Sequence, residues 1–427
     1  MEKSLYVGLL GFGVVGSGVV KVMEENAVLI AARSGVPIKI KRIIDRDPFR
    51  PRPVSVPHEM LSARPEDAWE DPDISIVVEA IGGVRPSKEY ILAALRAGKN
   101  VVTSNKEVIA KHGGELIEEA IRNNVNLLFE GAVGGGIPIL HPIKECLTAN
   151  RIEEVSGIVN GTTNYILSKM TEEGRPFAEV LEEAKARGYA ESDPSADIKG
   201  YDASYKAAIL ASLAFDARVK WEDVYFEGIS RITQEDIHNA RQMGYVIKLL
   251  ALVRRTGAGL EVRVHPTLIP KAHPLASVSG NNNAILVRGN AVVALMFYGQ
   301  GAGSLPTASA VVGDIIDIAR HLTFGGGLLI RNPLVRMEVK PIDEVVSRFY
   351  LRLRVSNRPG ILGAIASIFG KFGISIEAVT QREAVGEYAQ LVVIVHQVEE
   401  AKMRDALAVL SEEETGAEVA SLIRVGL

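Results

Sequence analysis

The residues best suited to chemistry lie in one stretch of the sequence, 188–206, where acids and a lysine share a loop and the start of a helix. The acids are Glu191, Asp193, Asp197 and Asp202, and the lysine is Lys206. Asp202 and Lys206 are four residues apart, so they share one face of a helix. The helix continues almost entirely apolar to Phe215, which predicts that it is buried.

Lys206 is unusual for its position. A cation in the first turns of a helix opposes the helix dipole, and Asp202 is the natural occupant there. Burial and the dipole lower a lysine's pKa while a neighbouring carboxylate raises it, and a lysine balanced in this way can exchange a proton with a substrate hydroxyl. In this interpretation Glu191 and Asp197 receive a substrate ammonium group. The alternative is an ordinary i, i+4 ion pair beside a solvated, helix-capping loop.

A glycine-rich turn opens the chain. Gly11, Gly13 and Gly16 match G-x-G-x-x-G, directly after an apolar strand at residues 5–10 and at the start of a helix. The first glycine permits a tight turn, the second lets backbone approach a pyrophosphate, and the third allows close helix–strand packing. Phosphate oxygens can then accept from the unpaired N–H groups of the helix start. In this context the motif predicts dinucleotide binding, and a purely structural turn is the alternative.

The residues after the second strand bear on which dinucleotide binds. That strand ends at Asp45-Arg46-Asp47. An acid there would hold the ribose 2′-hydroxyl of NAD, whereas an arginine favours the 2′-phosphate of NADP. Both kinds of residue are present, so the choice between NAD and NADP stays open.

A second lysine, Lys106, follows a predicted strand at residues 100–103. The carboxyl end of a sheet strand is where ligands sit in such folds, so Lys106 is a candidate for the active site. The alternative is a solvent-facing lysine at the start of a helix.

The first part of the chain alternates strands and helices. Strands are expected at 5–10, 39–44, 74–80 and 100–103, and helices at 14–33 and 87–97. This alternation predicts an α/β fold with a doubly wound parallel sheet of the Rossmann type.

The middle of the chain has a mixed character. A glycine-dense junction, 131–138, leads into helical periodicity at 176–188 and 202–215 and strand-like segments at 152–159, 260–268 and 284–298. These segments predict a sheet covered by helices, an α+β domain. After the glycines of 299–303, a helix is expected at 308–322 and a linker at 331–343, where prolines recur.

The last part of the chain forms a separate unit. Strands are expected at 350–355, 374–381, 389–396 and 419–425, and helices at 360–372 and 399–411. The β-α-β-β-α-β order predicts a ferredoxin-like domain. We therefore expect a dinucleotide-binding domain at 1–135, completed by about 303–340, a substrate-binding and dimerisation domain at 136–302, and a regulatory domain at 345–427.

The composition is that of an ordinary globular protein, with 47% hydrophobic and 23% charged residues and a net charge of −4. Nothing in it indicates a nucleic-acid partner or a membrane anchor, and no segment approaches the roughly 20 apolar residues of a membrane span. The single cysteine, Cys146, cannot form an intrachain disulfide, and no secretory signal is evident. We therefore expect a cytoplasmic protein, and the apolar middle region predicts a homodimer or a higher homo-oligomer.

Over residues 4–340 the sequence resembles homoserine dehydrogenase. The motifs that carry the resemblance are the glycine turn, Val102–Lys106, Glu130–Pro138, Gly157–Tyr165, the 188–206 stretch and Gly301–Ser309. The resemblance implies interconversion of L-homoserine and L-aspartate 4-semialdehyde with NAD or NADP, in the biosynthesis of threonine, methionine and isoleucine.

The resemblance also assigns roles to residues. It places Phe12, Val14 and Val15 of the glycine turn, with Thr103 and Gly303, at the cofactor, and Lys106 between nicotinamide and substrate. It implies that homoserine is bound by Glu191, Asp197 and Asp202, that Lys206 or Lys106 relays the proton, and that Gly161 and Thr162 line the junction with the cofactor. Finally, it implies a monovalent cation, often sodium, held by Glu130 and the carbonyls of Val133, Gly135 and Ile137. Oxygen ligands suit such a hard cation; the same segment also suits a hinge.

The C-terminal unit resembles an ACT domain, which implies a small-amino-acid effector, here threonine. The residues concerned are Asn357, Gly360, Ile361 and Leu362, where backbone N–H groups at a helix start can hold a carboxylate. The alternative is a domain that only stabilises a dimer. Whether threonine inhibits is not readable from the sequence.

Two rival functions need different residues. A phosphorylating semialdehyde dehydrogenase needs a cysteine thiolate, for which Cys146 is the one candidate. Cys146 is, however, better explained as a small buried residue near a helix end. A regulator that binds a dinucleotide and an amino acid would keep the glycine turn and the ACT-like unit but have no use for the 188–206 stretch.

Overall fold

The computed structural model describes residues 4–257, 259–327, 329, 334–335, 337–381, 387–412 and 417–426. Their contacts divide the chain into two compact units. Unit 1 comprises Met1–Val155, Ala208–Trp221 and Asn283–Met337, and unit 2 comprises Ser156–Ala207, Glu222–Asn282 and Glu338–Leu427. The division into three domains expected from the sequence therefore stays a prediction, and each unit is described by itself.

Unit 1 is built on a six-stranded sheet in the order β3-β2-β1-β4-β5-β6, with every neighbouring pair parallel. Its strands are β1 (Leu5–Leu10), β2 (Ile38–Ile44), β3 (Leu61–Ser62), β4 (Ile74–Glu79), β5 (Asn100–Thr103) and β6 (Leu127–Leu128). This order is that of a dinucleotide-binding sheet, in which ligands bind where the winding reverses, here between β1 and β4. The predicted doubly wound sheet is confirmed.

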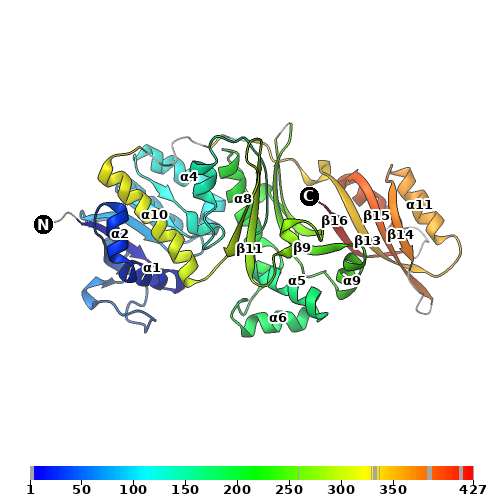
Figure 1. Cartoon of the computed structure of the whole chain (residues 1–427), viewed down its shortest axis with the longest axis horizontal. Coiled ribbons are helices and arrows are strands. Elements are labelled where there is room, and N and C mark those ends of the chain that lie inside the picture. The colour runs from blue at the N-terminus through cyan, green and yellow to red at the C-terminus, as the bar shows by residue number, and fades with distance from the viewer. Residues whose placement is uncertain are drawn as a thin grey trace. The chain divides into compact units, whose positions relative to one another are not determined.

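The helices of unit 1 include α1 (Val14–Glu25), α2 (Ala27–Ser34), α3 (Ser87–Arg96), α4 (Lys106–Arg122) and α10 (Ser304–Phe324). Helix α10 packs against α1 and α2 (Figure 1), and its buried residues join those of β1 and β4 in one apolar core. The single helix expected at 14–33 is wrong in one respect, because the chain breaks at Asn26 (φ −111°). Asparagine side chains compete for backbone hydrogen bonds, which favours such a break.

Unit 1 also contains β11 (Asn282–Gly289) and β12 (Val293–Gln300), beside the first part of β7 (Ile152–Ile158), and a π-helical turn, Pro142–Cys146. The sequence predicted one strand at 284–298. Two strands form instead, because Gly289-Asn290 is a turn-forming pair that ends the first.

Unit 2 contains α5 (Gly161–Glu173), α6 (Phe177–Ala186), α7 (Ser195–Ile198), α9 (Gln234–Gln242), β8 (Tyr225–Phe226), β9 (Tyr245–Arg255) and β10 (Leu260–Pro270). Helix α8 (Tyr201–Ala214) begins in unit 2 and ends in unit 1. The antiparallel pair β9–β10 is long and largely buried.

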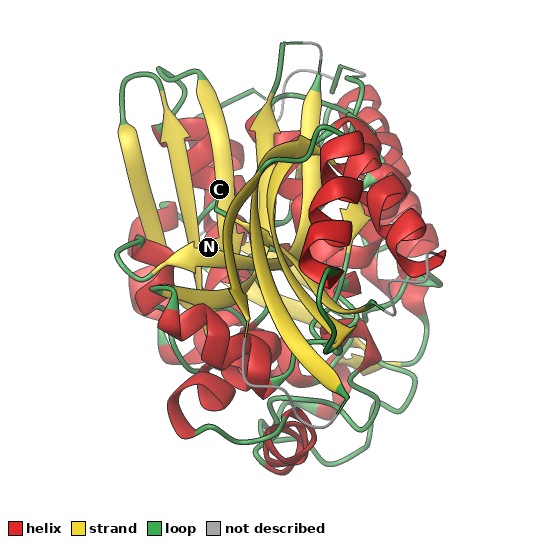
Figure 2. Cartoon of the chain, turned by 90° about the vertical axis from the view of Figure 1, so that its right-hand side faces the viewer, coloured by secondary structure: helices red, strands yellow, loops and turns green. Residues whose placement is uncertain are grey.

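The C-terminal part of unit 2 comprises β13 (Val346–Ser356), α11 (Ile361–Lys371), β14 (Ile376–Gln381), β15 (Tyr388–Glu399), α12 (Glu400–Glu412) and β16 (Glu418–Val425). The antiparallel strands lie in the order β16-β13-β15-β14, and both helices bury residues in one core with β13 and β15. In Figure 2, where this domain faces the viewer, its helices lie to one side of its strands. The predicted ferredoxin-like domain is confirmed.

Strand β10 joins the C-terminal part of unit 2 to the middle of the chain. Strand β16 pairs in parallel with β10, which also pairs in parallel with β8. The predicted linker 331–343 lies partly outside the described residues; within them, Val339 bridges to Leu260. Among the described residues, no helix is long and apolar enough to cross a membrane.

Candidate active site

The glycine turn lies at the carboxyl end of β1. Gly11 has φ +98°, and a Cβ atom there would lie 2.7 Å from the carbonyl oxygen of Ala80, after β4. A Cβ on Gly16 would lie 2.1 Å from the carbonyl oxygen of Gly11. Nothing lies within 4 Å of the corresponding position at Gly13, the residue before α1. The turn is therefore closed toward the sheet and open at its second glycine, as pyrophosphate binding requires.

The residues of the glycine turn differ in how far their side chains are exposed to a cofactor. Val14, at the exposed start of α1, is 71% exposed, whereas the side chain of Phe12 is 3% exposed and packs in the core. The carbonyl oxygen of Val14 accepts from Ser304 Oγ at 2.7 Å, so Gly303 is brought to the turn by α10. Contact of Phe12, Val14, Val15 and Gly303 with a cofactor stays a prediction, and for Phe12 the side chain is turned away from solvent.

The end of β2 holds an organised carboxylate. Asp45 accepts from the N–H of Phe12 at 2.9 Å and of Asp47 at 3.0 Å, and pairs with Arg52 at 3.0 Å. Desolvation raises the pKa of Asp45, but these N–H groups and Arg52 outweigh it, so the pKa is lowered. Arg52 also donates to four backbone carbonyls of this region, which occupies its guanidinium. Arg46 is exposed.

Glu79, which no sequence pattern indicated, organises the neighbouring loops. Its buried carboxylate accepts from Thr103 Oγ1 at 2.6 Å and from the N–H of Ile81 at 2.8 Å. Thr103 Oγ1 accepts in turn from the N–H of Asn105, whose side chain caps α4. Lys106, half-buried, is the first residue of that helix. Glu79 thus fixes the loops after β4 and β5, and with them the position of Lys106.

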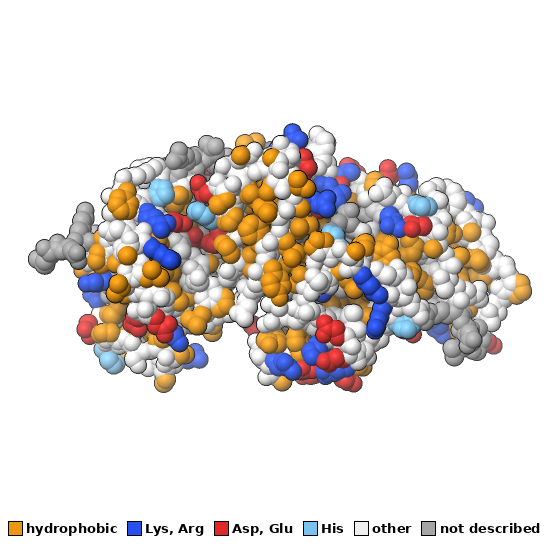
Figure 3. Space-filling model, viewed as in Figure 1, with side chains coloured by type: hydrophobic (Ala, Val, Ile, Leu, Met, Phe, Trp, Pro, Cys, Tyr) orange, Lys and Arg blue, Asp and Glu red, His pale blue; other side chains and the backbone are white. Residues whose placement is uncertain are grey.

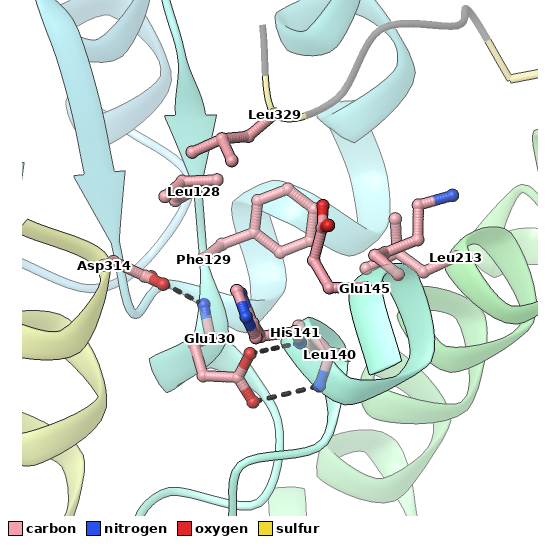
Figure 4. Close-up of a pocket in the computed structure, with 10 residues that line it drawn as sticks. Leu128, Phe129, Glu130, Leu140, His141, Glu145, Leu213, Asp314 and Leu329 are labelled. Carbon is pink, nitrogen blue, oxygen red and sulfur yellow. Dashed lines mark hydrogen bonds between the residues drawn. The ribbon is translucent and has the colours of Figure 1, made fainter. Parts of the chain in front are cut away.

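Glu130 lies in a small cavity of unit 1, shown in Figure 4. Its carboxylate accepts from the N–H groups of Ile139 (2.5 Å), Leu140 (2.9 Å) and His141 (2.6 Å), while its own N–H donates to Asp314 at 2.9 Å. Burial raises the pKa of Glu130, against the effect of these donors, and burial beside Glu130 raises that of Asp314 well above its usual range. The Glu130 side chain is therefore engaged with backbone N–H groups, and its role as a metal ligand stays a prediction.

The carbonyl oxygens of Val133, Gly135 and Ile137 fit a cation better. All three residues are buried, and no backbone or side-chain hydrogen bond found among the described residues ends on these oxygens. Gly134 and Gly135 both have positive φ, and Gly135 packs against the backbone of Gly301. No group of three or more His, Cys, Asp or Glu side chains within the described part of the chain could hold a metal ion.

Unit 2 brings together most of the predicted substrate residues. Lys206 Nζ donates to Asp202 Oδ2 at 2.8 Å and to the carbonyl oxygen of Val159 at 2.7 Å. Asp202 and Lys206 are 4% and 6% exposed. The predicted i, i+4 ion pair therefore exists, and it is buried. Because burying two charges costs desolvation energy, a buried ion pair is weak evidence for a purely stabilising role.

Asn160, which was not predicted as a substrate-binding or catalytic residue, contacts both acids. Its amide donates to Asp197 Oδ1 at 2.7 Å and to Asp202 Oδ2 at 2.8 Å, while its carbonyl oxygen accepts from the N–H of Thr163 and caps α5. The signal was available: an asparagine before Gly-Thr-Thr is typical of a helix start. Burial, and then the Asp202 carboxylate, raise the pKa of Asp197.

The other predicted substrate residues lie around this cluster. Gly161 and Thr162 form the first turn of α5, and Thr162 Oγ1 donates to the carbonyl oxygen of Tyr189 at 2.7 Å. Glu191 is exposed and joins none of the hydrogen bonds or ion pairs found in the cluster. Lys106 and the glycine turn belong to unit 1 and the cluster to unit 2, so their meeting stays a prediction.

Cys146 is exposed, so the expectation of a buried cysteine is wrong. Ile143 and Leu147 are buried on the same turn. The wider π-helical turn aligns residues i and i+4 and carries i+3 away from the buried side.

The fold and these clusters define a nicotinamide-dependent oxidoreductase that carries an ACT domain. Three family models match the chain: "Homoserine dehydrogenase, NAD binding domain" over residues 11–130, "Homoserine dehydrogenase" over 138–316, and "ACT domain" over 349–414. The chain belongs to the homoserine dehydrogenase family.

Individual relatives agree over the full length. Homoserine dehydrogenase of Synechocystis is 46% identical over 98% of this chain and 99% of the relative, and that of Bacillus subtilis 42% over 99% and 98%. A crystal structure of a homoserine dehydrogenase from Thiobacillus denitrificans superposes with a TM-score of 0.95, at 41% identity, over 100% of this chain and 99% of the other. A hyperthermophilic archaeal homoserine dehydrogenase mutant in complex with NADPH covers 74% of this chain and 97% of its own, at 29% identity and a TM-score of 0.63. The predicted enzyme class is confirmed, and both rival functions are set aside.

Proposed function

We propose that the cluster of Asp197, Asp202 and Lys206 binds and activates L-homoserine. The reaction converts L-homoserine and NAD(P)+ to L-aspartate 4-semialdehyde, NAD(P)H and a proton. The observation that carries the proposal is Asn160, whose amide binds both carboxylates at once, with Lys206 on the second. Lys206 supplies one positive charge to these two buried carboxylates and the amide is neutral, so a negative charge remains that a substrate ammonium group would neutralise.

The residues of the cluster have different roles in this proposal. Burial raises the pKa of Asp197, and the ammonium group of a bound substrate would form an ion pair with this carboxylate. Lys206 exchanges the hydroxyl proton of the substrate: as the neutral amine it accepts the proton during oxidation of the alcohol, and as the ammonium so formed it donates a proton to the carbonyl oxygen in the reverse reaction. The nicotinamide, when bound, accepts the hydride. Lys106 is the second candidate for the proton relay, and its position at the start of α4 favours a role in binding instead.

Glu191 has a smaller role in this proposal. It lies two residues after Tyr189, whose carbonyl oxygen holds Thr162, but its carboxylate is in solvent. The family resemblance predicts that Glu191 binds homoserine. Such binding would require this loop to close over the substrate.

The cofactor and the cation would be held within unit 1. The open position at Gly13 and the exposed start of α1 suit the pyrophosphate. The carbonyl oxygens of Val133, Gly135 and Ile137 would hold a monovalent cation such as sodium. Glu130 would contribute by fixing the residues that follow that loop, through its three backbone donors.

We infer threonine as the effector of the ACT domain. Helix α11 starts at Gly360 (φ +93°) without a side-chain cap, so the N–H groups of its first turn face an exposed loop that includes Asn357. Leu362 is 40% exposed, whereas Ile361 is buried in the ACT core and can offer main-chain contacts alone. An amino-acid carboxylate is the ligand such a helix start favours.

A homo-oligomer is proposed from β12. This edge strand exposes Val293 (76%), Leu295 (38%), Met296 (42%) and Tyr298 (56%). Hydrophobic side chains gather on the surface around β11 in Figure 3. An apolar edge strand is a template for pairing with a second copy. Cytoplasmic location stays a prediction from the sequence.

The test is the Lys206→Met variant of the full chain. We expect kcat for homoserine oxidation to fall by about two to four orders of magnitude, the usual contribution of a general acid–base group. NAD(P)H binding, followed by its fluorescence, stays unchanged. Lys271→Met, which changes an exposed lysine of unit 2 just after β10, is the matched control. Normal turnover in Lys206→Met would refute the assignment.

A further inference from the structure

Arg424, on the last strand of the ACT domain, is a buried cation that reaches outside that domain. Its Nε and Nη2 atoms donate to Glu400 of α12, both at 2.7 Å, and its Nη1 atom donates to Glu227 at 2.7 Å. Nη2 also lies 3.1 Å from the hydroxyl oxygen of Tyr225. Arg424 is 4% exposed, so these bonds are shielded from water.

Glu227 belongs to a short segment, Tyr225–Ile229, that lies between the ACT domain and the substrate cluster. Tyr225 and Phe226 pair with β10, the strand that also pairs with β16, and the N–H of Glu227 donates to the carbonyl oxygen of Val264 at 2.7 Å. The segment is therefore anchored in the sheet at one end and held by Arg424 through its side chains.

The other side of this segment packs on the turn that joins the two substrate carboxylates. The N–H of Ile229 donates to the carbonyl oxygen of Ile198 at 2.8 Å. A Cβ on Gly228 would lie 1.9 Å from that oxygen, and a Cβ on Gly200 would lie 2.9 Å from the carbonyl oxygen of Glu227. The two backbones thus touch with no side chain between them.

The turn has little freedom of its own. Asp197 begins one hydrogen-bonded turn, since the N–H of Gly200 donates to its carbonyl oxygen at 3.0 Å, and Asp202 is the second residue of α8, which follows this turn directly. The ring of Tyr201, between them, packs on Phe226 with centroids 4.9 Å apart. A displacement of Tyr225–Ile229 therefore changes the spacing of Asp197 and Asp202.

We propose that Arg424 is a positioning residue for the substrate site: through Glu227 it holds the segment Tyr225–Ile229 against the turn Ile198–Gly200 and thereby sets the distance between Asp197 and Asp202. An effector that shifts β16 would reach the substrate carboxylates by this route. The inference rests on the proposed role of these carboxylates in binding homoserine.

The test compares two Glu→Gln variants of the full-length enzyme. Glu227→Gln removes the charge that Arg424 holds, while Glu400 keeps Arg424 in the ACT domain. Glu377→Gln is the matched control, because Glu377 pairs with Arg348 inside the ACT sheet and has no part in the Tyr225–Ile229 segment. Tyr225→Phe, which removes the hydroxyl near Arg424, is a second test variant.

We expect the KM for homoserine to rise about three- to tenfold in Glu227→Gln, the upper limit corresponding to 1.4 kcal/mol, with the KM for NAD(P) unchanged. Hydrogen exchange of the amides in 198–204 rises in the same variant, and Glu377→Gln changes neither quantity. A wild-type KM and wild-type exchange in Glu227→Gln would overturn the inference, as would an equal effect of Glu377→Gln. If the wild-type protein itself did not oxidise homoserine, the proposed function would fail, and the exchange measurement would still test the positioning.

Discussion

Lys248 is a buried lysine whose ionisation makes a quantitative prediction. It lies on β9, 5% exposed, and its Nζ donates to Asn164 Oδ1 at 3.0 Å and to the carbonyl oxygen of Val278 at 2.5 Å. Asn164 in turn donates to the carbonyls of Val278, Gly280 and Asn282. Lys248 therefore fixes the 278–282 loop to α5, the helix that Asn160 caps.

Burial lowers the pKa of Lys248 from 10.5 to about 8. Between these two values the unfolded chain binds more protons than the folded one, so the free energy of unfolding rises with pH in this window. The difference between these two pKa values corresponds to about 3 kcal/mol. Between pH 7.5 and 9.5 the wild-type protein should gain about 2 kcal/mol from this group.

The perturbation is Lys248→Met, which removes the titrating group. The variant also removes the Lys248 donor from Asn164 Oδ1 and from the carbonyl oxygen of Val278, which keeps Asn164 Nδ2 as a donor, and each lost hydrogen bond costs about 1–3 kcal/mol at any pH. We expect the difference in unfolding free energy between wild type and variant to grow by about 2 kcal/mol from pH 7.5 to 9.5. Urea unfolding at the two pH values, followed by tryptophan fluorescence and circular dichroism, measures it.

Lys271→Met, the loss of an exposed lysine just after β10, is the control. A difference between wild type and Lys248→Met that stays constant between the two pH values would refute the reasoning, because it would mean that Lys248 keeps its ordinary ionisation despite burial.

Three further predictions concern the site. Because burial and Asp202 raise the pKa of Asp197, the KM of the wild-type enzyme for homoserine should increase as the pH falls, beginning above the usual pKa range of an aspartate. The Asp197→Asn variant should have a high KM that does not vary with acid pH. An identical pH profile in both proteins would contradict the proposed role of Asp197. Asp45→Ser removes an ionised carboxylate from the ribose end of the cofactor site, so kcat/KM with NADP relative to NAD should rise by about tenfold, or 1.4 kcal/mol; an unchanged ratio would show that Asp45 does not select the cofactor. Cys146→Ser should oxidise homoserine as the wild type does, because no thiolate takes part, and loss of activity in a folded variant would revive a thioester mechanism.

Much of the fold follows from local sequence patterns. The strand, glycine turn and helix at 5–25 and the β-α-β-β-α-β order after residue 345 were predicted because apolar periodicity and turn residues specify them within short windows. The break at Asn26 and the division of 284–298 into two strands were missed, although each is marked by an asparagine, because a single residue decides them.

The site was predicted less completely, and the reasons are tertiary. Glu79 acts on Thr103, 24 residues later, because β4 and β5 are neighbours in the sheet, and no local pattern shows this pairing. Asn160 acts on carboxylates 37 and 42 residues away. The bonds from the Glu130 carboxylate to backbone N–H groups 9 to 11 residues later were likewise not predicted, and its role at a cation stays a prediction. The acids and the lysine of the 188–206 stretch were recognised, whereas Glu79 and Asn160, which organise the neighbouring loops, became visible in three dimensions.

The lone thiol of the chain has a practical consequence. Cys146 is exposed, at the end of the turn whose residues Lys144 and Glu145 line the cavity beside Glu130. A maleimide fluorophore or spin label will therefore attach at one known position without prior mutagenesis. A reporter there would register the arrival of the cofactor, or of the proposed monovalent cation, in the native sequence, by a change in emission or in label mobility.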